Sequence, residues 1–272
     1  MKIFKHRKLL IKEIIKYRDL CFVPTMGGLH KGHEYLIKKA KQKKGKTIVS
    51  IFVNEKQFDS RKDYRCYPRD LKLDFKILKK LKVDYLYLPQ SNDIYNFKTK
   101  NKIYEDKFIK ELCGKFRKSH FKGVLDVVNR LLEIIKPTYI YLGKKDYQQM
   151  YLINKHIVKS NIKTKVVKCK TIREKNGVAC SSRNKNLNSS DMKIASNIYN
   201  YLTKYKKIII KTKNDQKKSS KLKNKLLDFG ATKIDYIKSL NINNPKNSSK
   251  QYARKNLFIA YYLKNVRLID NF

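Results

Sequence analysis

One ten-residue segment constrains the fold of this chain more than any other. It runs from Pro24 to His33 and reads Pro-Thr-Met-Gly-Gly-Leu-His-Lys-Gly-His. The apolar run at 20–23 before it is typical of a buried strand, and apolar residues at helical spacing follow it from Tyr35 to Ala40. A strand, a glycine-containing turn and a helix in this order present backbone N–H groups to a phosphate.

Two histidines strengthen this interpretation. His30 and His33 are three residues apart, so they fall on the same side of the first helical turn. The segment therefore predicts a site for the phosphates of a nucleotide.

Length and composition set the broad class. The chain has 272 residues and is 41% hydrophobic, which suits one large and one small folded domain. Its apolar runs are far too short to cross a bilayer, and its first residues lack the apolar core of a secretory signal. Five scattered cysteines without a C-x-x-C pair favour reduced thiols. We expect a cytoplasmic protein that does not associate with membranes.

The formal net charge of +44 suggests nucleic-acid binding at first sight. The lysines are nevertheless spread along the whole chain, and they accompany an excess of Asn, Ile, Tyr and Phe. These are the residue types that A/T-rich codons encode, so codon bias explains the charge without a partner. We expect no specific nucleic-acid ligand, and a binding role would require salt-dependent affinity of useful strength.

Strands and helices alternate through the first part of the chain. Strands are predicted at 20–23, 47–53, 83–88, 138–142 and 164–169. Helices are predicted after the first strand, from Pro68 with Leu71, Phe75, Leu78 and Leu81 inward, at 124–135 before Pro137, and at 146–158. This order indicates an α/β fold with a doubly wound, mostly parallel Rossmann-like sheet, whose ligands bind at the carboxyl ends of the strands.

The character of the sequence changes near Ile172. A polar segment at 184–190 precedes a lysine-rich helical stretch at 191–229 that is broken at 211–220. Strands are predicted at 233–240, 257–263 and 266–269, the last two as a hairpin, with an Asn/Ser-rich flexible loop at 241–251. We therefore predict a first domain over 1–171 and a smaller α+β domain over 172–272.

Polar groups recur in the loops that follow the predicted strands. They are Asn54 and Gln57, then Arg117, Ser119 and His120, then the run from Gly143 to Gln149, and then the run from Ser181 to Asn184. Each group alone has an ordinary explanation in local backbone hydrogen bonds or helix capping. Several of them nevertheless fall at the same end of predicted parallel strands, which favours a shared site.

Taken together, these strings resemble the pantothenate synthetase family. The resemblance covers nearly the whole chain and depends on PTMGGLHKGH, SIFVNEKQF, YPRDLKLD, RKSHFKGVLDVVNRLL, YLGKKDYQQ, ACSSRN and VRLIDN. H-x-G-H alone would indicate only the wider nucleotidyl-transfer superfamily, whereas FVN-x-x-QF, KDYQQ and SSRN are more specific. The resemblance implies a ligase that joins pantoate to β-alanine with ATP, a C-terminal domain that acts as a lid over a cleft, and a homodimer.

The resemblance also implies roles for individual residues. The carboxylate of pantoate would attack the α-phosphorus of ATP to give a pantoyl adenylate, which β-alanine would then attack, releasing AMP. His30, His33 and Lys145 are the expected catalytic residues, with His33 as a proton donor. The residues expected to bind ATP are Met26, Gly27, Gly28, Leu29, His30, Lys31, Gly32, His33, Gly143, Lys144, Lys145, Asp146, Ile172, Cys180, Ser181, Ser182 and Arg183.

The remaining expectations concern pantoate and the metal. Gln57 and Gln149 suit a substrate with hydroxyls and a carboxylate, and Asn54 and Arg117 are expected to contact the substrates as well. Mg²⁺ is expected with ATP, held mainly by phosphate oxygens, with Asp74 as the acidic residue nearby.

The chain departs from the family pattern at three positions. Glu55 replaces the usual proline, which predicts a looser loop, Lys144 stands where glutamate is common, and Cys180 replaces a larger apolar residue. Two other functions stay open on the sequence alone: an adenylyltransferase that stops at nucleotide transfer, and a nucleic-acid-binding protein.

Overall fold

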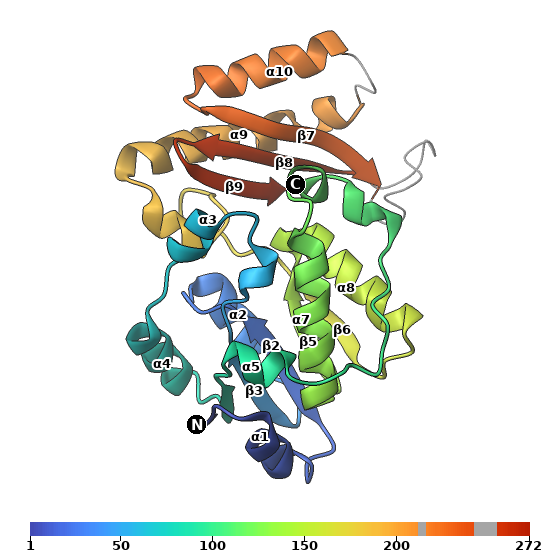
Figure 1. Cartoon of the computed structure of the whole chain (residues 1–272). Coiled ribbons are helices and arrows are strands. Elements are labelled where there is room, and N and C mark those ends of the chain that lie inside the picture. Colours follow the sequence, from blue (N-terminus) through green and yellow to red (C-terminus); the bar gives the residue numbers. More distant parts are fainter. Residues whose placement is uncertain (212–215, 242–254) are drawn as a thin grey trace. The chain divides into compact units, whose positions relative to one another are not determined.

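The computed structural model describes residues 1–211, 216–241 and 255–272, without the side chains of 209–211 and 216–219 (Figure 1). The chain divides into two compact units. The first contains 1–109 and 117–171, and the second contains 110–116 and 172–272.

The first unit is built on a six-stranded parallel sheet in the order β1-β4-β3-β2-β5-β6. Its strands are β1 (Lys2–Phe4), β2 (Leu20–Thr25), β3 (Lys46–Ile51), β4 (Tyr85–Tyr87), β5 (Tyr139–Gly143) and β6 (Lys165–Cys169). The predicted parallel α/β sheet is confirmed, and every predicted strand is present. The edge strand β1 was not predicted, because three residues are too short for a periodic pattern.

Helices cover both faces of this sheet (Figure 1). They are α1 (Arg7–Ile14), α2 (Lys31–Lys41), α3 (Arg61–Arg65), α4 (Leu71–Lys80), α5 (Ser91–Tyr95), α7 (His120–Ile135) and α8 (Tyr147–Lys159). Apolar residues of α2 and α4, such as Ile37 and Leu78, pack on Val23, Val49 and Leu86 on one face. Because side chains alternate along a strand, the neighbouring strand residues face the opposite layer, to which the almost fully apolar face of α7 belongs.

The predicted start of α4 at Pro68 is wrong. The helix begins at Leu71, since the side chain of Asp70 caps it by accepting the N–H of Leu73 at 2.9 Å. Leu71 is 44% exposed, so it does not face the core as the spacing predicted. The predicted end of α7 is confirmed, with Lys136 in the left-handed region immediately before Pro137.

The second unit has an antiparallel three-stranded sheet in the order β7-β8-β9. Its elements are α6 (Cys113–Phe116), the 3₁₀ helix η4 (Ser182–Asn186), α9 (Ser189–Lys211), α10 (Gln216–Asp228), β7 (Lys233–Asn241), β8 (Lys255–Leu263) and β9 (Val266–Asn271). The predicted hairpin is confirmed as the pair β8 and β9. Residues of the predicted flexible loop after Asn241 lie outside the described residues.

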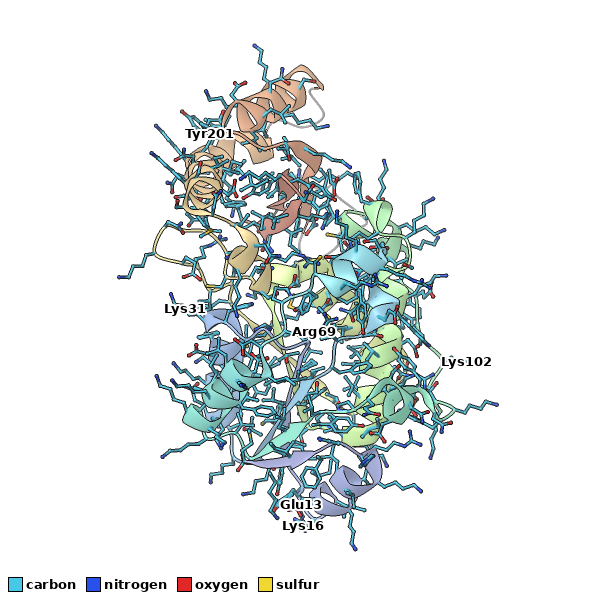
Figure 2. All side chains as sticks on the ribbon, turned by 60° about the vertical axis from the view of Figure 1, so that its left-hand side comes forward. Glu13, Lys16, Lys31, Arg69, Lys102 and Tyr201 are labelled. Atoms are coloured by element: carbon cyan, nitrogen blue, oxygen red, sulfur yellow. The ribbon has the colours of Figure 1, made fainter. Side chains whose placement is uncertain are left out.

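Basic side chains project from many separate elements of the chain (Figure 2). Lys16 follows α1, Lys31 begins α2 and Lys102 lies in the loop before α6, and the three point outward in different places. In the part of the chain that the structure describes, no helix is both long and apolar enough to cross a membrane.

Candidate active site

The strand order reverses direction between β2 and β5. From β2 the chain proceeds through β3 to β4 on one side, and then returns to β5 and β6 on the other. In open parallel sheets, ligands bind in the crevice at such a switch point, outside the carboxyl ends of the strands. The segments after β2, β3 and β5 are those that the sequence singled out.

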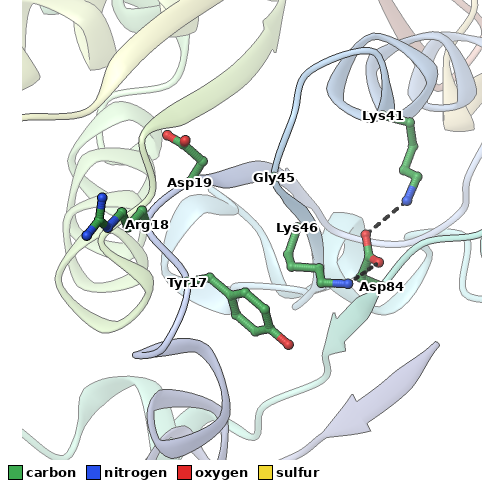
Figure 3. Close-up of a pocket in the computed structure, with 7 residues that line it drawn as sticks. All are labelled: Tyr17, Arg18, Asp19, Lys41, Gly45, Lys46 and Asp84. Carbon is green, nitrogen blue, oxygen red and sulfur yellow. Dashed lines mark hydrogen bonds and ion pairs between the residues drawn. The ribbon is translucent and has the colours of Figure 1, made fainter.

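A pocket at the opposite end of the sheet is a separate feature (Figure 3). It is lined by Tyr17, Arg18, Asp19, Lys41, Gly45, Lys46 and Asp84. Asp84 pairs with Lys41 at 2.9 Å and with Lys46 at 3.6 Å, so its charges are largely matched inside the protein. Lys46 begins β3, which places this pocket at the amino ends of the strands, away from the predicted site.

The turn after β2 depends on a buried carboxylate. Asp74, 1% exposed, accepts the N–H of Gly28 at 2.9 Å and the N–H of Leu29 at 2.7 Å. Gly27 and Gly28 have positive φ angles of 77° and 61°, a region that glycine adopts at little cost. A Cβ at Gly27 would also lie 2.9 Å from the Asp74 carboxylate.

These contacts involve two residues that are expected to bind ATP. The N–H groups of Gly28 and Leu29 both donate to Asp74, and the ATP contact of these residues stays a prediction. A carboxylate under the turn also repels anions, so a phosphate is favoured further along, at the start of α2. The structure thus gives Asp74 the task of holding the turn.

His30 and His33 lie side by side at the start of α2, with ring centroids 4.1 Å apart. His30 is the N-cap, and its Nδ1 accepts the N–H of Gly32 at 3.1 Å. Because Nδ1 is an acceptor, a neutral His30 ring carries its proton on Nε2 and presents an N–H donor there. The Nδ1 of His33 is buried and has no hydrogen-bond partner among the described residues.

Burial lowers the pKa of His33 to about 4, opposed by the negative charge of Asp146 and assisted by the positive charge of Lys145. These two residues follow β5, so the structure brings the H-x-G-H segment and the Gly-Lys-Lys-Asp segment together at the switch point. Lys145 and Asp146 also pair at 3.6 Å. With this pKa, His33 is neutral at pH 7 in the free protein.

The segment after β3 forms a short 3₁₀ helix, η1 (Glu55–Gln57), with Asn54 as its N-cap. Gln57 is buried and donates its Nε2–H to the Sδ of Met26 at 2.9 Å, which joins the ends of β3 and β2. Glu55 is exposed and its carbonyl accepts the Phe58 N–H, so the loop closes into a regular turn without proline.

The side chain of Asn54, an expected substrate contact, is fully engaged within the protein. Its Nδ2 donates to Gln57 Oε1 at 3.3 Å and to the Gly123 carbonyl at 3.1 Å. Its Oδ1 accepts from the Lys56 N–H at 3.3 Å and the Tyr95 hydroxyl at 2.8 Å. Two donors and two acceptors are all that an amide side chain offers. The structure therefore gives Asn54 a role in positioning Gln57, and its contact with the substrates stays a prediction.

Helix α7 and the residues just before it support the same segment. Arg117 Nε donates to Asp59 at 2.8 Å, and its Nη2 donates to the backbone carbonyl of Gln57 at 3.2 Å. His120 Nδ1 lies 2.7 Å from the same backbone carbonyl. Arg117 is therefore mostly engaged with the protein. Gly123 allows the close approach, because a Cβ there would lie 2.3 Å from the Lys56 carbonyl oxygen. The sequence offered one clue to Gly123, a lone glycine inside an apolar helix.

The two adjacent glutamines of α8 have different environments. Gln148 is buried and donates to the Phe108 carbonyl at 2.7 Å. Gln149 is half-buried, and its side chain makes no hydrogen bond to another described residue. At the end of β5, a Cβ on Gly143 would meet no described atom within 4 Å, and its φ of −80° is open to any residue.

The other predicted ATP-binding residues lie in the second unit. The Cys180 N–H donates to the Ile172 carbonyl at 2.9 Å, and Ser181 caps η4 by accepting the Arg183 N–H. Arg173, which the sequence reasoning missed, braces this loop through a bidentate ion pair with Asp270 at 2.6 and 3.0 Å. Ile172 and the run 180–183 are thus neighbours within this unit.

A parallel doubly wound sheet with two adjacent histidines at the start of the first helix after β2 is typical of nucleotide-binding α/β proteins. A family model described as Pantoate-beta-alanine ligase matches residues 2–272. A curated relative, the pantothenate synthetase of Francisella tularensis subsp. novicida, is 43% identical over 260 residues, covering 95% of this chain and 91% of the relative.

Solved structures agree with this match. The pantoate-beta-alanine ligase of Francisella tularensis, complexed with beta-gamma ATP and beta-alanine, is 40% identical with a TM-score of 0.85, covering 100% of this chain and 97% of that one. The pantothenate synthetase of Thermus thermophilus is 30% identical with a TM-score of 0.90, covering 100% and 99%. The chain belongs to the pantoate–β-alanine ligase family, whose members join pantoate to β-alanine with ATP.

The neutrality of His33 predicts a pH dependence of stability. Its pKa is about 4 in the folded chain and about 6.5 when unfolded, so the unfolded chain binds more protons between these values. The free energy of unfolding is therefore highest above pH 6.5. It decreases as the pH drops toward 4, by at most about 3 kcal/mol. In His33→Gln, the free energy of unfolding measured by urea titration should depend less on pH across this window. Burial also lowers the pKa of His156, which leaves a residual slope in both proteins; identical slopes would contradict the prediction.

Asp74→Asn should weaken the turn after β2. The amide would keep one acceptor but turn an NH₂ group toward the N–H of Gly28 or Leu29, which costs about 1.5–3 kcal/mol in the free energy of unfolding. Asp70→Asn is the matched control on the same helix, since asparagine is an equally good N-cap. Urea denaturation of both variants tests this, and equal, small losses would show that Asp74 does not hold the turn.

Proposed function

We propose that this chain joins pantoate to β-alanine in two steps through an enzyme-bound pantoyl adenylate. The observation that carries the proposal is the meeting of His30 and His33 with Lys145 and Asp146 at the switch point of the sheet. A nucleotide at this position would have its phosphates beside two imidazoles, an ammonium and a helix N-terminus.

In the first step, a carboxylate oxygen of pantoate attacks the α-phosphorus of ATP, and the bond from that phosphorus to the bridging oxygen of pyrophosphate breaks. The protein supplies no nucleophile, so its contribution is orientation and stabilisation of developing charge. His30 offers its Nε2–H, and Lys145 offers a charge. A helix N-terminus alone contributes only about 0.3–1 kcal/mol toward an anion, so these side chains carry most of the stabilisation.

His33 is neutral in the free protein and would donate a hydrogen bond to a phosphate oxygen. The negative charge of a bound triphosphate favours the protonated form of a neighbouring imidazole. Binding of ATP would therefore raise the low pKa of His33, which lets it act as the proton donor that the sequence predicted.

In the second step, the amine of β-alanine attacks the acyl carbon of the adenylate. The amide bond forms, the bond to the phosphate oxygen of AMP breaks, and the nitrogen loses a proton. Gln57 and Gln149 would hold the pantoyl group through its hydroxyl and carboxyl oxygens. Arg117 would contribute indirectly, because it holds the Gln57 carbonyl.

The remaining ATP contacts follow the family resemblance. Gly143 and Asp146 are assigned to the ribose and Ile172 to the adenine edge. From the second unit, Ser181, Ser182 and Arg183 are assigned to the phosphates. The open space at Gly143 supports its assignment, because a small residue there leaves room for the ribose.

The part of the chain that the structure describes does not fit a metal site made by protein ligands. Asp74, the expected ligand, already accepts two backbone N–H groups. Among the described residues, no group of three or more His, Cys, Asp or Glu side chains could hold a metal ion. Mg²⁺ is accordingly assigned to the phosphate oxygens of ATP alone.

Three further proposals follow the resemblance: a homodimer, a cytoplasmic location and a lid function for the second unit. The alternative of an adenylyltransferase is set aside, because the family model matches the chain from residue 2 to residue 272.

The experiment is to incubate the protein with ATP, Mg²⁺, pantoate and β-alanine, and to follow AMP and pantothenate. AMP that appears only with both acids supports the proposal. Exchange of labelled pyrophosphate into ATP with pantoate alone would identify the adenylate. Turnover with a nucleotide acceptor, or ADP as the product, would contradict it.

Gly143→Ala should separate folding from ATP binding. Because φ is negative and space is free, the substitution should raise the free energy of unfolding by about 0.4–1 kcal/mol. An added methyl group against the ribose should raise the KM for ATP about ten-fold, on the scale of overpacking a contact. Gly27→Ala is the contrast, since its positive φ should cost stability by about 1–2 kcal/mol. An unchanged KM for ATP in Gly143→Ala would remove Gly143 from the ribose site.

Gln149→Ala should weaken pantoate binding selectively. Loss of a hydrogen bond to the substrate should raise the KM for pantoate by about 10- to 100-fold, with the KM for ATP nearly constant. Gln148→Ala is the neighbouring control. It removes the hydrogen bond to the Phe108 carbonyl and should lower the stability, but it should leave the ratio of the KM values for pantoate and ATP unchanged. Steady-state kinetics decides; equal effects of Gln149→Ala on ATP and pantoate would contradict the assignment.

A further inference from the structure

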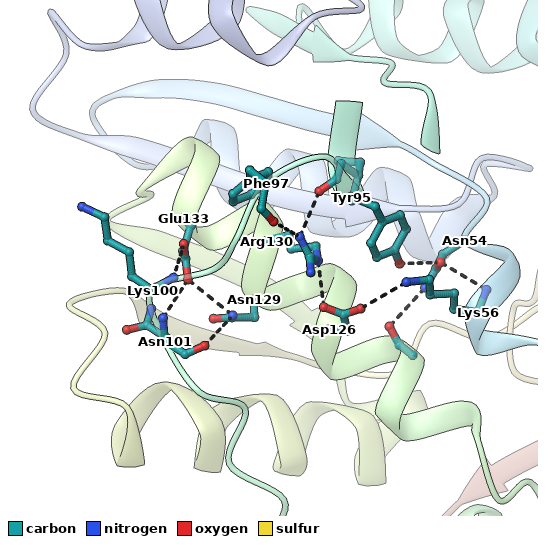
Figure 4. A network of polar contacts seen from close by, with 12 residues as sticks. Asn54, Lys56, Tyr95, Phe97, Lys100, Asn101, Asp126, Asn129, Arg130 and Glu133 are labelled. Atoms are coloured by element: carbon teal, nitrogen blue, oxygen red, sulfur yellow. Dashed lines mark hydrogen bonds and ion pairs between the residues drawn. The ribbon is translucent and has the colours of Figure 1, made fainter. Parts of the chain in front are cut away.

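A chain of side-chain hydrogen bonds leads from helix α5 to Gln57, and Figure 4 shows its first bond, between Tyr95 and Asn54. The hydroxyl of Tyr95 donates to Asn54 Oδ1 at 2.8 Å. Asn54 Nδ2 then donates to Gln57 Oε1 at 3.3 Å, and Gln57 Nε2 donates to Met26 Sδ at 2.9 Å. Every bond in this chain points in the same direction, from the phenol to the pocket.

Backbone groups fix this direction. Asn54 Oδ1 faces the Lys56 N–H, which can only donate, and Asn54 Nδ2 faces the Gly123 carbonyl, which can only accept. The amide of Asn54 is therefore locked in one orientation. Since its Nδ2 faces Gln57, the facing atom of Gln57 must be the oxygen, and Gln57 presents its NH₂ group to the site.

The ring of Tyr95 is held independently of its hydroxyl. Lys56 Nζ lies 3.7 Å and Arg130 Cζ 5.0 Å from the ring centroid, and Asp126 pairs with both cations, at 3.8 and 2.8 Å. Arg130 also donates to the Phe97 carbonyl at 2.8 Å, two residues beyond the ring. Burial raises the pKa of Tyr95, so the phenol keeps the proton that it donates.

We infer that Tyr95 is a positioning residue that, through Asn54, fixes Gln57 as a hydrogen-bond donor toward the substrate. The group that Gln57 receives must then be an acceptor oxygen, such as a hydroxyl or carboxylate oxygen of pantoate. Met26 Sδ is a weak acceptor, so an oxygen that replaces it gains a stronger bond. This inference rests on the proposed binding of pantoate by Gln57.

Tyr95→Phe is the test, because it removes only the hydroxyl and keeps a ring for Lys56 and Arg130. Without that bond, the amide of Asn54 loses one of four partners and the orientation of Gln57 is less strictly held. We expect the KM for pantoate to rise about five-fold, as for the loss of one neutral hydrogen bond, with the KM for ATP and β-alanine within about two-fold.

Tyr85→Phe is the matched control. Tyr85 is buried and Tyr95 is half-buried, and the Tyr85 hydroxyl bonds Glu13 and Tyr17, both at 2.9 Å, at the amino end of β4. Its loss should lower the Tm about as much as Tyr95→Phe without changing the KM for pantoate. Equal pantoate KM values in the two variants, or a parallel rise for ATP in Tyr95→Phe, would overturn the inference.

A second readout does not depend on turnover. In ¹⁵N–¹H spectra, the side-chain NH₂ resonances of Asn54 and Gln57, assigned with Asn54→Asp and Gln57→Glu, should shift in Tyr95→Phe and stay in place in Tyr85→Phe. If these resonances did not move in Tyr95→Phe, Tyr95 would not position Gln57 through Asn54, even in an active enzyme. If the wild-type protein made no pantothenate while these resonances moved as expected, the proposed function would fail, but the positioning of Gln57 by Tyr95 through Asn54 would stand.

Discussion

The carboxylate of Asp74 reaches from the first turn of α4 to the turn after β2, where it accepts the N–H groups of Gly28 and Leu29. The turn has two successive residues with positive φ, and it sets where α2 begins. Because His30 and His33 sit at that beginning, their position depends on two buried ionic hydrogen bonds that span 46 and 45 residues of sequence. Such bonds are roughly twice as strong as neutral ones, which suits a turn that must hold its shape when an anion arrives.

The phosphate side and the pantoate side of the proposed site depend on different interactions. On the phosphate side, burial keeps His33 neutral beside the ion pair of Lys145 and Asp146. On the pantoate side, neutral amides are oriented by a saturated hydrogen-bond network, in which Asn54 uses all four of its sites. A saturated network leaves no alternative orientation of comparable energy, because flipping an amide would oppose donor to donor and acceptor to acceptor.

Gly123 and Asp74 are each locally unfavourable, and each allows two distant segments to pack together. A glycine in the middle of α7 costs helix stability, yet it lets the helix touch the Lys56 carbonyl and so supports η1 from behind. Asp74 carries the penalty of burial and is compensated by two N–H groups. In both cases a local penalty is accepted where two distant segments must meet at the carboxyl ends of the strands.

The sequence by itself determined the parallel α/β sheet, the C-terminal hairpin and the motifs of the site, because hydrophobic periodicity and short motifs are local properties of the chain. It misplaced the start of α4, since the Asp70 cap outweighed the Pro68 signal, and it missed β1, which is too short for a pattern. Only the tertiary structure decided that Asp74 holds the glycine turn, that Asn54 orients Gln57, and that Tyr95 and Gly123 belong to the same network. Except for the local bond between Asn54 and Gln57, these roles arise from contacts between segments tens of residues apart. The hydrogen-bonding partner of a polar side chain is fixed only when such segments pack together.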